Sequence, residues 1–403
     1  MFVGIDDTDS VDGMCTTYLA ARLCLKLGVK ETPCLIRLNP NIPYKTRGNG
    51  AVAFKTEKRH KKEILSFVKK NSMLDDPKTN PGVVFLGDES RSPMLQEFYR
   101  RAVSEHVTIE EAETAASSAR AEFHKFKNGR GIIGALAAIG FTGDRTYEII
   151  AYRDRANWGQ PARKIDLESV RRMDRELYPK VFDNIGADGK RILITPRGHD
   201  PIFCGIRGTS EDAVNAAWDM VKPLEAIELV QVFATNQATD AHLRRKGIGE
   251  LKPYDCAIVT GRVISKPGTV AGGHTIFRLE DDTGAIDCAA YKKSGSFRKI
   301  VANLEVGDKV SAYGGLGKYH KTLNLEKIEV LSLSIRETVE IPSCCGKNMT
   351  STGRDGGYKC KKCGKRISHK EVKVSHGFGA ISPGTYDVPP GSRRHLSRPV
   401  FLR

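Results

Sequence analysis

The pattern of apolar residues changes several times along the 403-residue chain, and these changes constrain the fold more than any single motif does. Up to about residue 140, strand-like and helix-like segments alternate, which predicts an α/β domain. From residue 144 the order is strand, helix, strand, strand, helix, strand, which is typical of a ferredoxin-like fold. From residue 255, five short strands separated by glycine turns predict an OB-fold β-barrel. We therefore expect a multidomain α/β and α+β protein.

The expected domains and their elements follow from these segments. In the first domain, 1–140, we expect strands at 2–6, 34–38, 51–55 and 83–86 and helices at 16–27, 57–70, 94–105 and 109–125. In the second, 141–250, we expect strands at 147–153, near 182, 191–195 and 229–234 and helices at 167–177 and 210–222. In the third, 251–335, we expect strands at 256–264, 275–280, 285–291, 309–316 and 322–330. A small fourth module with a basic tail occupies 340–403.

The charge of the chain indicates its partner. Lys and Arg number 64 against 48 Asp and Glu, which gives a net charge of +16. Such an excess favours a polyanion, because phosphate contacts release bound counterions, and nucleic acid is the first candidate. The longest apolar run, around 132–141, is far too short to span a bilayer, and no basic segment followed by an apolar one begins the chain. We therefore expect a cytoplasmic protein with no membrane contact.

The ten cysteines divide into scattered and clustered ones. Six occur singly, while Cys344, Cys345, Cys360 and Cys363 gather near the end, which suggests reduced thiols and a zinc site rather than disulfides. The two-residue spacer between Cys360 and Cys363 lets both thiolates reach one tetrahedral ion. Cys344 and Cys345 are adjacent, and neighbouring side chains usually diverge, so a histidine could replace one ligand. The candidates are His369 and His376.

The most informative motif is an acidic cluster after the first expected strand. Asp6, Asp7 and Asp9 would repel one another unless a cation lay between them, and Mg²⁺ is the hard divalent ion that carboxylates hold. The alternative is a solvated loop or a helix cap. Gly13 precedes Thr16 and Thr17. These hydroxyls are candidates for phosphate binding or phosphate acceptance, or they simply begin a helix.

Two glycine-broken loops could bind anions. Gly129, Arg130 and Gly131 begin a segment that formally fits the dinucleotide pattern, but the residues before it look helical, so the Rossmann interpretation fails in its context. Amides at such a turn still bind phosphate, and Arg130 adds a forked donor. Lys45 and Arg47 lie in the second loop. The alternatives are a simple turn and a polar hairpin turn, and no Walker sequence is present.

The remaining candidates would contact the substrate. Asp200 and Asp240 are carboxylates suited to a small cation, and Arg207 lies near a glycine turn, whereas His199 is more typical of a surface histidine. The expected barrel carries basic and aromatic residues that would hold single-stranded nucleic acid by stacking and phosphate contacts, although several of the aromatics must belong to the core. These residues are Arg262, Lys266, Phe277, Arg278, Tyr291, Lys292, Lys293 and Tyr319.

In combination, these motifs resemble a known family. The residues that carry the resemblance are Gly4-Ile5-Asp6-Asp7-Thr8-Asp9, Gly13-Met14-Cys15-Thr16-Thr17, Arg130-Gly131-Ile132-Ile133-Gly134-Ala135-Leu136, Asp200-Pro201 with Gly205-Ile206-Arg207-Gly208, and Arg393-Arg394-His395-Leu396-Ser397-Arg398-Pro399. With the OB-fold and zinc ribbon, they resemble the archaeal tRNA(Ile) 2-agmatinylcytidine synthetase (agmatidine synthase) family over nearly the whole length. Only the adjacent Cys344 and Cys345 depart from the family pattern, which has a spacer between them.

The resemblance implies a kinase-like first domain and OB and zinc modules that grip tRNA. It also implies an ATP-dependent ligase. The wobble cytidine of the CAU anticodon of tRNA(Ile) is activated at its C2 oxygen, and agmatine replaces that oxygen so that AUA codons are read. ATP yields AMP and phosphate. By motif match, Asp6, Asp7 and Asp9 would handle Mg²⁺ and ATP, and Thr16 corresponds to the family's autophosphorylated threonine.

Other assignments rest on residue type and loop context. The expected phosphate-binding residues are Gly13, Thr17, Lys45, Arg47, Gly129, Arg130 and Gly131. Two competing hypotheses remain. One is a non-enzymatic binder of single-stranded nucleic acid built on the OB-fold and zinc ribbon, in which the acidic cluster would have no use. The other is a related tRNA ligase that uses a different amine.

Overall fold

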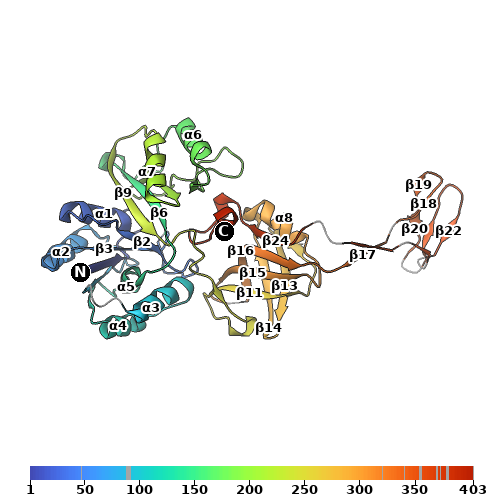
Figure 1. The fold of residues 1–403 in the computed structure, drawn as a ribbon, viewed down its shortest axis with the longest axis horizontal. Helices are drawn as coiled ribbons and strands as arrows, with labels where there is room; N and C mark the ends of the chain where they lie inside the picture. Colours follow the sequence, from blue (N-terminus) through green and yellow to red (C-terminus); the bar gives the residue numbers. More distant parts are fainter. Residues whose placement is uncertain are drawn as a thin grey trace.

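The computed structural model describes residues 1–46, 48–87, 92–319, 321–339, 341–353, 356–368, 371–372, 374–377 and 381–402. Figure 1 shows an α/β half, a β-barrel beside it, and a small cysteine-containing module carried away from both on a thin two-stranded stalk. None of the helices within these described ranges is long and apolar enough to cross a membrane.

A single nine-stranded sheet runs through the α/β half. Its order is β5-β4-β1-β3-β2-β9-β6-β8-β7. The strands are β1 (Phe2–Asp6), β2 (Cys34–Arg37), β3 (Gly50–Lys55), β4 (Gly82–Leu86), β5 (Glu122–Lys125), β6 (Thr146–Arg153), β7 (Val181–Phe182), β8 (Ile202–Gly208) and β9 (Ile227–Thr235). The parallel pairing of β2 with β9 joins the two predicted domains into one sheet. The order β9-β6-β8-β7 is fully antiparallel and belongs to the βαββαβ unit that the sequence predicts.

Helices cover both faces of this sheet. The apolar residues of α1 (Thr16–Leu27) and α2 (Lys61–Asn71) pack on one face of the first five strands. Those of α3 (Pro93–Ser104), α4 (Ile109–Ser118) and α5 (Ile132–Gly140) pack on the other. Alternate residues of β3 and β4 point to opposite faces, as strands require, so each face has its own core. The helices α6 (Leu167–Leu177) and α7 (Glu211–Met220) cover the ferredoxin-like part.

Two expected elements are wrong. The predicted helix 109–125 ends at Ser118, and its last part is the edge strand β5. A strand, not a helix, therefore precedes Gly129. The dinucleotide interpretation was rejected because a helix was expected there, and this reason is wrong. β5 pairs antiparallel with β4, however, rather than standing in a parallel βαβ unit. The predicted strand 191–195 is loop except for a bridge at Ile192, and β8 takes its place in the sheet.

The barrel has the predicted OB-fold. Its strands are β11 (Cys256–Val263), β13 (His274–Asp281), β14 (Gly284–Ala290), β15 (Lys309–Leu316) and β16 (Thr322–Ser332), with a short β12 (Gly268–Val270) and a helix α8 (Ser296–Ala302). β11 pairs with both β13 and β15, which closes the barrel. Phe277 is 1% exposed in its core. The prediction that Phe277 stacks on a base is wrong, because its ring is used in packing.

The last part of the chain leaves the barrel and returns. The stalk is β17 (Arg336–Val339) paired with β23 (Val374–Gly377), and it carries β18 (Ser343–Cys344), β19 (Lys347–Asn348), β20 (Thr350–Ser351), β21 (Tyr358–Lys359) and β22 (Arg366–Ile367). Then β24 (Gly384–Asp387) pairs with β16. Beyond it, the tail folds back onto the α/β half, where Leu396 and Ser397 are buried. The domain limits 1–140, 141–250, 251–335 and 340–403 stay a prediction.

Candidate active site between the two halves of the sheet

Glycines let helix α5 lie unusually close to the ends of β1 and β4. A Cβ atom at Gly4 would come within 2.0 Å of the Ala135 carbonyl oxygen, and one at Gly82 within 2.0 Å of the Ile132 nitrogen. Gly131 is equally confined by the backbone of β1 and β4. The glycine-rich segment therefore serves close helix-to-strand packing, a role the sequence analysis did not assign. Gly129 forms the preceding turn with a φ of 70°, a value that favours glycine.

The acidic cluster lies where α5 crosses the end of β1. The backbone nitrogen of Asp7 donates to Asp6 Oδ1 over 2.7 Å, and the backbone nitrogen of Asn80 donates to Asp7 Oδ2 over 3.2 Å. The pKa of Asp6 is raised well above its usual range, mainly by burial and secondly by the charge of Asp7. Burial, followed by the charge of Asp9, raises the pKa of Asp7 to about 6. Carboxylates that are buried and repel one another are suited to holding a divalent cation.

The N-terminus of helix α1 points to the same place. Its N-cap is Cys15, which makes no side-chain capping bond, and no acidic residue occupies the first turn. The amides of this turn can therefore bind an anion. Thr16 and Thr17 are the first two helical residues. The Thr16 hydroxyl lies 3.0 Å from the Thr8 hydroxyl, and both side chains are buried.

A cavity of about 380 Å³ opens between these residues and the ferredoxin-like part. Ten of the predicted site residues line it together: Asp6, Asp7, Asp9, Thr16, Thr17, Lys45, Arg130, Gly131, Asp200 and Arg207. Gly13, Gly129 and Asp240 do not line it. Arg47 lies outside the described residues. The lining residues that were not predicted from the sequence include four with polar or charged side chains that face the site, namely Arg37, Tyr44, Glu148 and His395.

Basic side chains form part of the cavity wall. The guanidinium of Arg130 lies 4.4 Å from the centre of the Tyr44 ring, a cation-π contact that fixes its direction. Lys45 donates to the Pro40 carbonyl, and burial, followed by the charge of Arg394, lowers its pKa.

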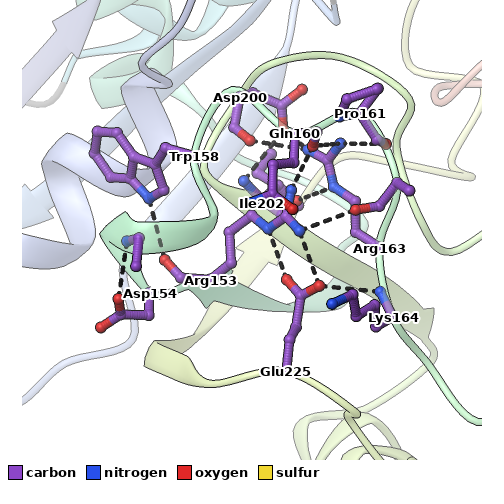
Figure 2. Close-up of polar contacts among 12 residues, drawn as sticks. Arg153, Asp154, Trp158, Gln160, Pro161, Arg163, Lys164, Asp200, Ile202 and Glu225 are labelled. Atoms are coloured by element: carbon purple, nitrogen blue, oxygen red, sulfur yellow. Dashed lines mark hydrogen bonds and ion pairs between the residues drawn. The ribbon is translucent and has the colours of Figure 1, made fainter.

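Two buried arginines fix the wall contributed by the ferredoxin-like part (Figure 2). Arg163 donates to the carbonyl oxygens of Gly198, Asp200 and Ile202 and to the Asp200 carboxylate, and the side chains of this ion pair are 1% and 2% exposed. Arg153 pairs with Glu225 and donates to the carbonyl oxygens of Gln160 and Ala162. Asp200 lines the cavity, and its Oδ1 accepts from Arg163 and from the backbone nitrogen of Ile202, so its predicted role in binding a cationic substrate stays a prediction.

Asp240 is structural. Its carboxylate accepts from Lys327, which is 0% exposed, and from the backbone nitrogen of Arg398. It thus ties the ferredoxin-like part to the barrel and to the tail, and it does not line the cavity, which contradicts its predicted contact with the substrate.

The candidate residues of the barrel form a separate surface. Arg262, Tyr291 and Lys292 are exposed, and none of them lines the cavity. The Tyr291 hydroxyl donates to Asn324, and its ring makes a T-shaped contact with the ring of His274, with 5.0 Å between the ring centres.

The four cysteines converge as a metal site requires. The Sγ atoms of Cys344, Cys345, Cys360 and Cys363 all lie within 4.8 Å of one another, and within the described ranges no other group of three or more metal-ligating residues is found. The adjacent pair converges because Cys345 adopts a left-handed φ of 55°. His369 lies outside the described residues, as does the side chain of His376.

Comparisons with known proteins agree with this arrangement. Family sequence models match at residues 2–64 (TiaS TCKD domain), 129–242 (TiaS FLD domain), 257–335 (OB-fold nucleic acid binding domain) and 341–376 (TiaS C-terminal zinc ribbon domain). The isoleucine-tRNA 2-agmatinylcytidine synthetase TiaS of Thermococcus sibiricus is 45% identical, over 100% of this chain and 96% of its own length. That of Methanocaldococcus jannaschii is 40% identical, over 100% and 98%.

Solved structures are equally similar. A crystal structure of TiaS in complex with its isoleucine tRNA and ATP matches with a TM-score of 0.88 at 39% identity, over 100% of this chain and 97% of that one. A complex of TiaS with the same tRNA, AMPCPP and agmatine matches with a TM-score of 0.85 at 37% identity and the same coverage.

Proposed function

The chain belongs to the TiaS family of isoleucine-tRNA 2-agmatinylcytidine synthetases, and on that premise we propose how its cavity performs the family reaction. The protein is an ATP-dependent ligase that joins agmatine to C2 of the wobble cytidine of tRNA(Ile) with a CAU anticodon. A C2 oxygen leaves poorly until it is phosphorylated. The cavity therefore has to bind ATP, a base removed from its stack, and an amine.

The observation that carries the proposal is the meeting of the acidic cluster with the α1 N-terminus at one cavity. Asp6 and Asp7 would hold Mg²⁺, which usually takes one or two carboxylates and completes its shell with phosphate oxygens and water. Asp9, the third predicted ligand, lines the same cavity, but among the described residues the three carboxylates do not converge as one set of ligands. Bound Mg²⁺ would neutralise charge on the transferring phosphoryl group. The α1 amides, Thr17 and Arg130 would bind phosphate oxygens. Thr16 would be the phosphate acceptor, with Thr8 positioning its hydroxyl.

The other modules supply tRNA binding. The exposed basic and aromatic residues of the barrel, Arg262, Tyr291 and Lys292, would contact the nucleic acid, and Zn²⁺ would be held by the four convergent thiolates. We place this activity in the cytoplasm, because its substrates are tRNA and ATP.

A binder without catalytic activity would have no use for buried aspartates that repel phosphates. The variant Asp7→Asn removes one anion and little volume, so we expect it to abolish agmatine incorporation and to leave tRNA affinity nearly unchanged. The exposed Asp219→Asn is the matched control. An equal loss of tRNA binding and product in Asp7→Asn would contradict the assignment.

A further inference from the structure

The tail places one histidine in the wall of the active cavity. His395 lies in a turn of the tail after β24, where its carbonyl oxygen accepts from the backbone nitrogen of Ala238 over 2.8 Å. The next carbonyl, that of Leu396, accepts from the backbone nitrogen of Asp240 over 2.9 Å. The backbone of His395 is therefore fixed to the loop after β9.

Hydrogen bonding fixes the tautomer of this histidine. Glu148 Oε2 accepts from Arg37 over 3.2 Å and from Nε2 of Gln237 over 2.6 Å. Because the Gln237 amide nitrogen is directed at the carboxylate, its Oε1 faces His395 Nδ1, at 2.7 Å. An amide oxygen can only accept, so Nδ1 carries the hydrogen and Nε2 keeps its lone pair.

The surroundings keep the ring neutral. Burial, followed by the charges of Arg37 and Arg207, lowers the pKa of His395 well below its usual range. Glu148 is a third charged group near the ring. Its carboxylate accepts a hydrogen bond from Gln237, which contacts the ring, and it is paired with Arg37. His395 keeps exposed surface, because it lines the cavity. An unprotonated nitrogen is thus available where the substrates meet.

We propose that Nε2 of His395 accepts the proton that the primary amine of agmatine loses on bonding to C2 of the activated cytidine. The proposal rests on the function given above. The amine lone pair forms the N–C2 bond, the C2–O bond breaks, and the oxygen leaves with its electron pair as part of the phosphate. The bonded nitrogen becomes cationic and acidic, so a weak base suffices to take its proton.

Two other features of the site serve this step. Arg37 and Arg207, which pair with Glu148 and Asp183, hold positive charge near the ring and so favour its neutral form. Gln237 acts as a positioning residue, because it holds the tautomer without facing the reacting atoms.

Single-turnover measurements on the full-length protein separate the two half-reactions. One reaction follows transfer of labelled phosphate from ATP to tRNA without agmatine, and the other follows agmatine incorporation. We expect His395→Ala to retain phosphate transfer and to slow incorporation by roughly 10²-fold, the scale of a lost general base. Added imidazole should restore part of the rate, and the exposed His199→Ala should behave as wild type.

Gln237→Glu supplies a second readout, because a carboxylate there would favour the imidazolium. It should move the pH profile of incorporation to higher pH and leave phosphate transfer in place. Equal loss of both half-reactions in His395→Ala, normal incorporation, or no rescue by imidazole would overturn the proposal. If His395→Ala does not fold, His395→Asn gives the same test. A wild-type protein that incorporates no agmatine would instead refute the proposed function.

Discussion

The carboxylate of Asp6 lies directly against the α-carbon of Gly134. A Cβ atom at position 134 would come within 1.9 Å of Asp6 Oδ2, so the first aspartate of the acidic cluster occupies space that only a glycine leaves free. The spacing between the helix and the strand thus sets the position of the proposed metal ligand.

Gly134→Ala should therefore impair catalysis more than folding. The added methyl group displaces the end of the Asp6 side chain, and a shift of about 1 Å at reacting groups can cost roughly 10²-fold in rate. Steady-state incorporation and thermal unfolding would be measured together. Gly268→Ala, whose Cβ would meet nothing within 4 Å, is the control. Wild-type activity in Gly134→Ala would contradict the proposed role of Asp6.

The raised pKa of Asp7 makes the metal-free protein sensitive to pH. The folded state holds this proton more tightly than the unfolded state, so the contribution of Asp7 to stability is present at low pH. This contribution is lost as the pH rises from the ordinary pKa of 3.8 through the folded-state pKa of about 6. In thermal unfolding without metal, the advantage of Asp7→Asn over wild type should grow across this range, and Mg²⁺ should reduce it. If the difference in stability between Asp7→Asn and the wild type did not change with pH, this would count against a buried Asp7 with a raised pKa.

The buried pair of His242 and Glu326 should stabilise the junction between barrel and sheet. Their nitrogen and oxygen lie 2.8 Å apart. Burial alone would raise the pKa of Glu326, but His242, Arg394 and Lys327 lower it to about 2. We expect Glu326→Gln to lower the free energy of unfolding at pH 7 by about 3 kcal/mol.

This loss of stability should become smaller as the pH falls. The contribution of an ionised Glu326 is full above the ordinary pKa of 4.5 and disappears as the pH approaches its pKa in the folded protein, about 2. Denaturant titrations at several pH values measure it, with the exposed Glu176→Gln as the control. A constant loss of stability down to pH 3 would exclude the ionised Glu326 carboxylate as its cause.

The four convergent thiolates should bind one zinc ion. Elemental analysis of the purified protein should find one equivalent of zinc, and Cys360→Ser should lose it because three thiolates bind the ion less tightly. Loss of zinc should weaken tRNA binding but spare ATP binding, since the module lies on its own stalk, away from the α/β half (Figure 1). The control is Cys34→Ser. Full zinc occupancy in Cys360→Ser would refute this ligand set.

Local patterns predicted the architecture and half of the site. Asp6, Asp7 and Thr16 fall within one short stretch after a strand, so a single motif brings them together. The OB-fold followed from strand spacing. The strand β5 was missed because its four residues, Glu122–Lys125, are at most half-buried and show no apolar alternation. The strand β8 was read as a turn because of its glycines, whereas Gly205 is needed to make room for the Glu148 carboxylate.

The other half of the site depends on contacts between distant parts of the chain. Arg37, Glu148, Gln237 and His395 come from four separate segments, and their association follows from the parallel pairing of β2 with β9 and the return of the tail. His395 lies in the tail segment that helps to carry the family resemblance, but nothing local to that segment places it in the cavity. Asp200 and Asp240 were assigned by residue type alone, and their buried ion pairs became evident only in the structure.

The central claim is tested most directly by mass analysis of the anticodon nucleosides. The pure protein is incubated with tRNA(Ile) carrying a CAU anticodon, ATP, Mg²⁺ and agmatine. We predict that the wobble cytidine gains the mass of agmatine less one water, only when ATP is present and not with Asp7→Asn. An unchanged cytidine on tRNA that remains bound to the wild-type protein would contradict the account.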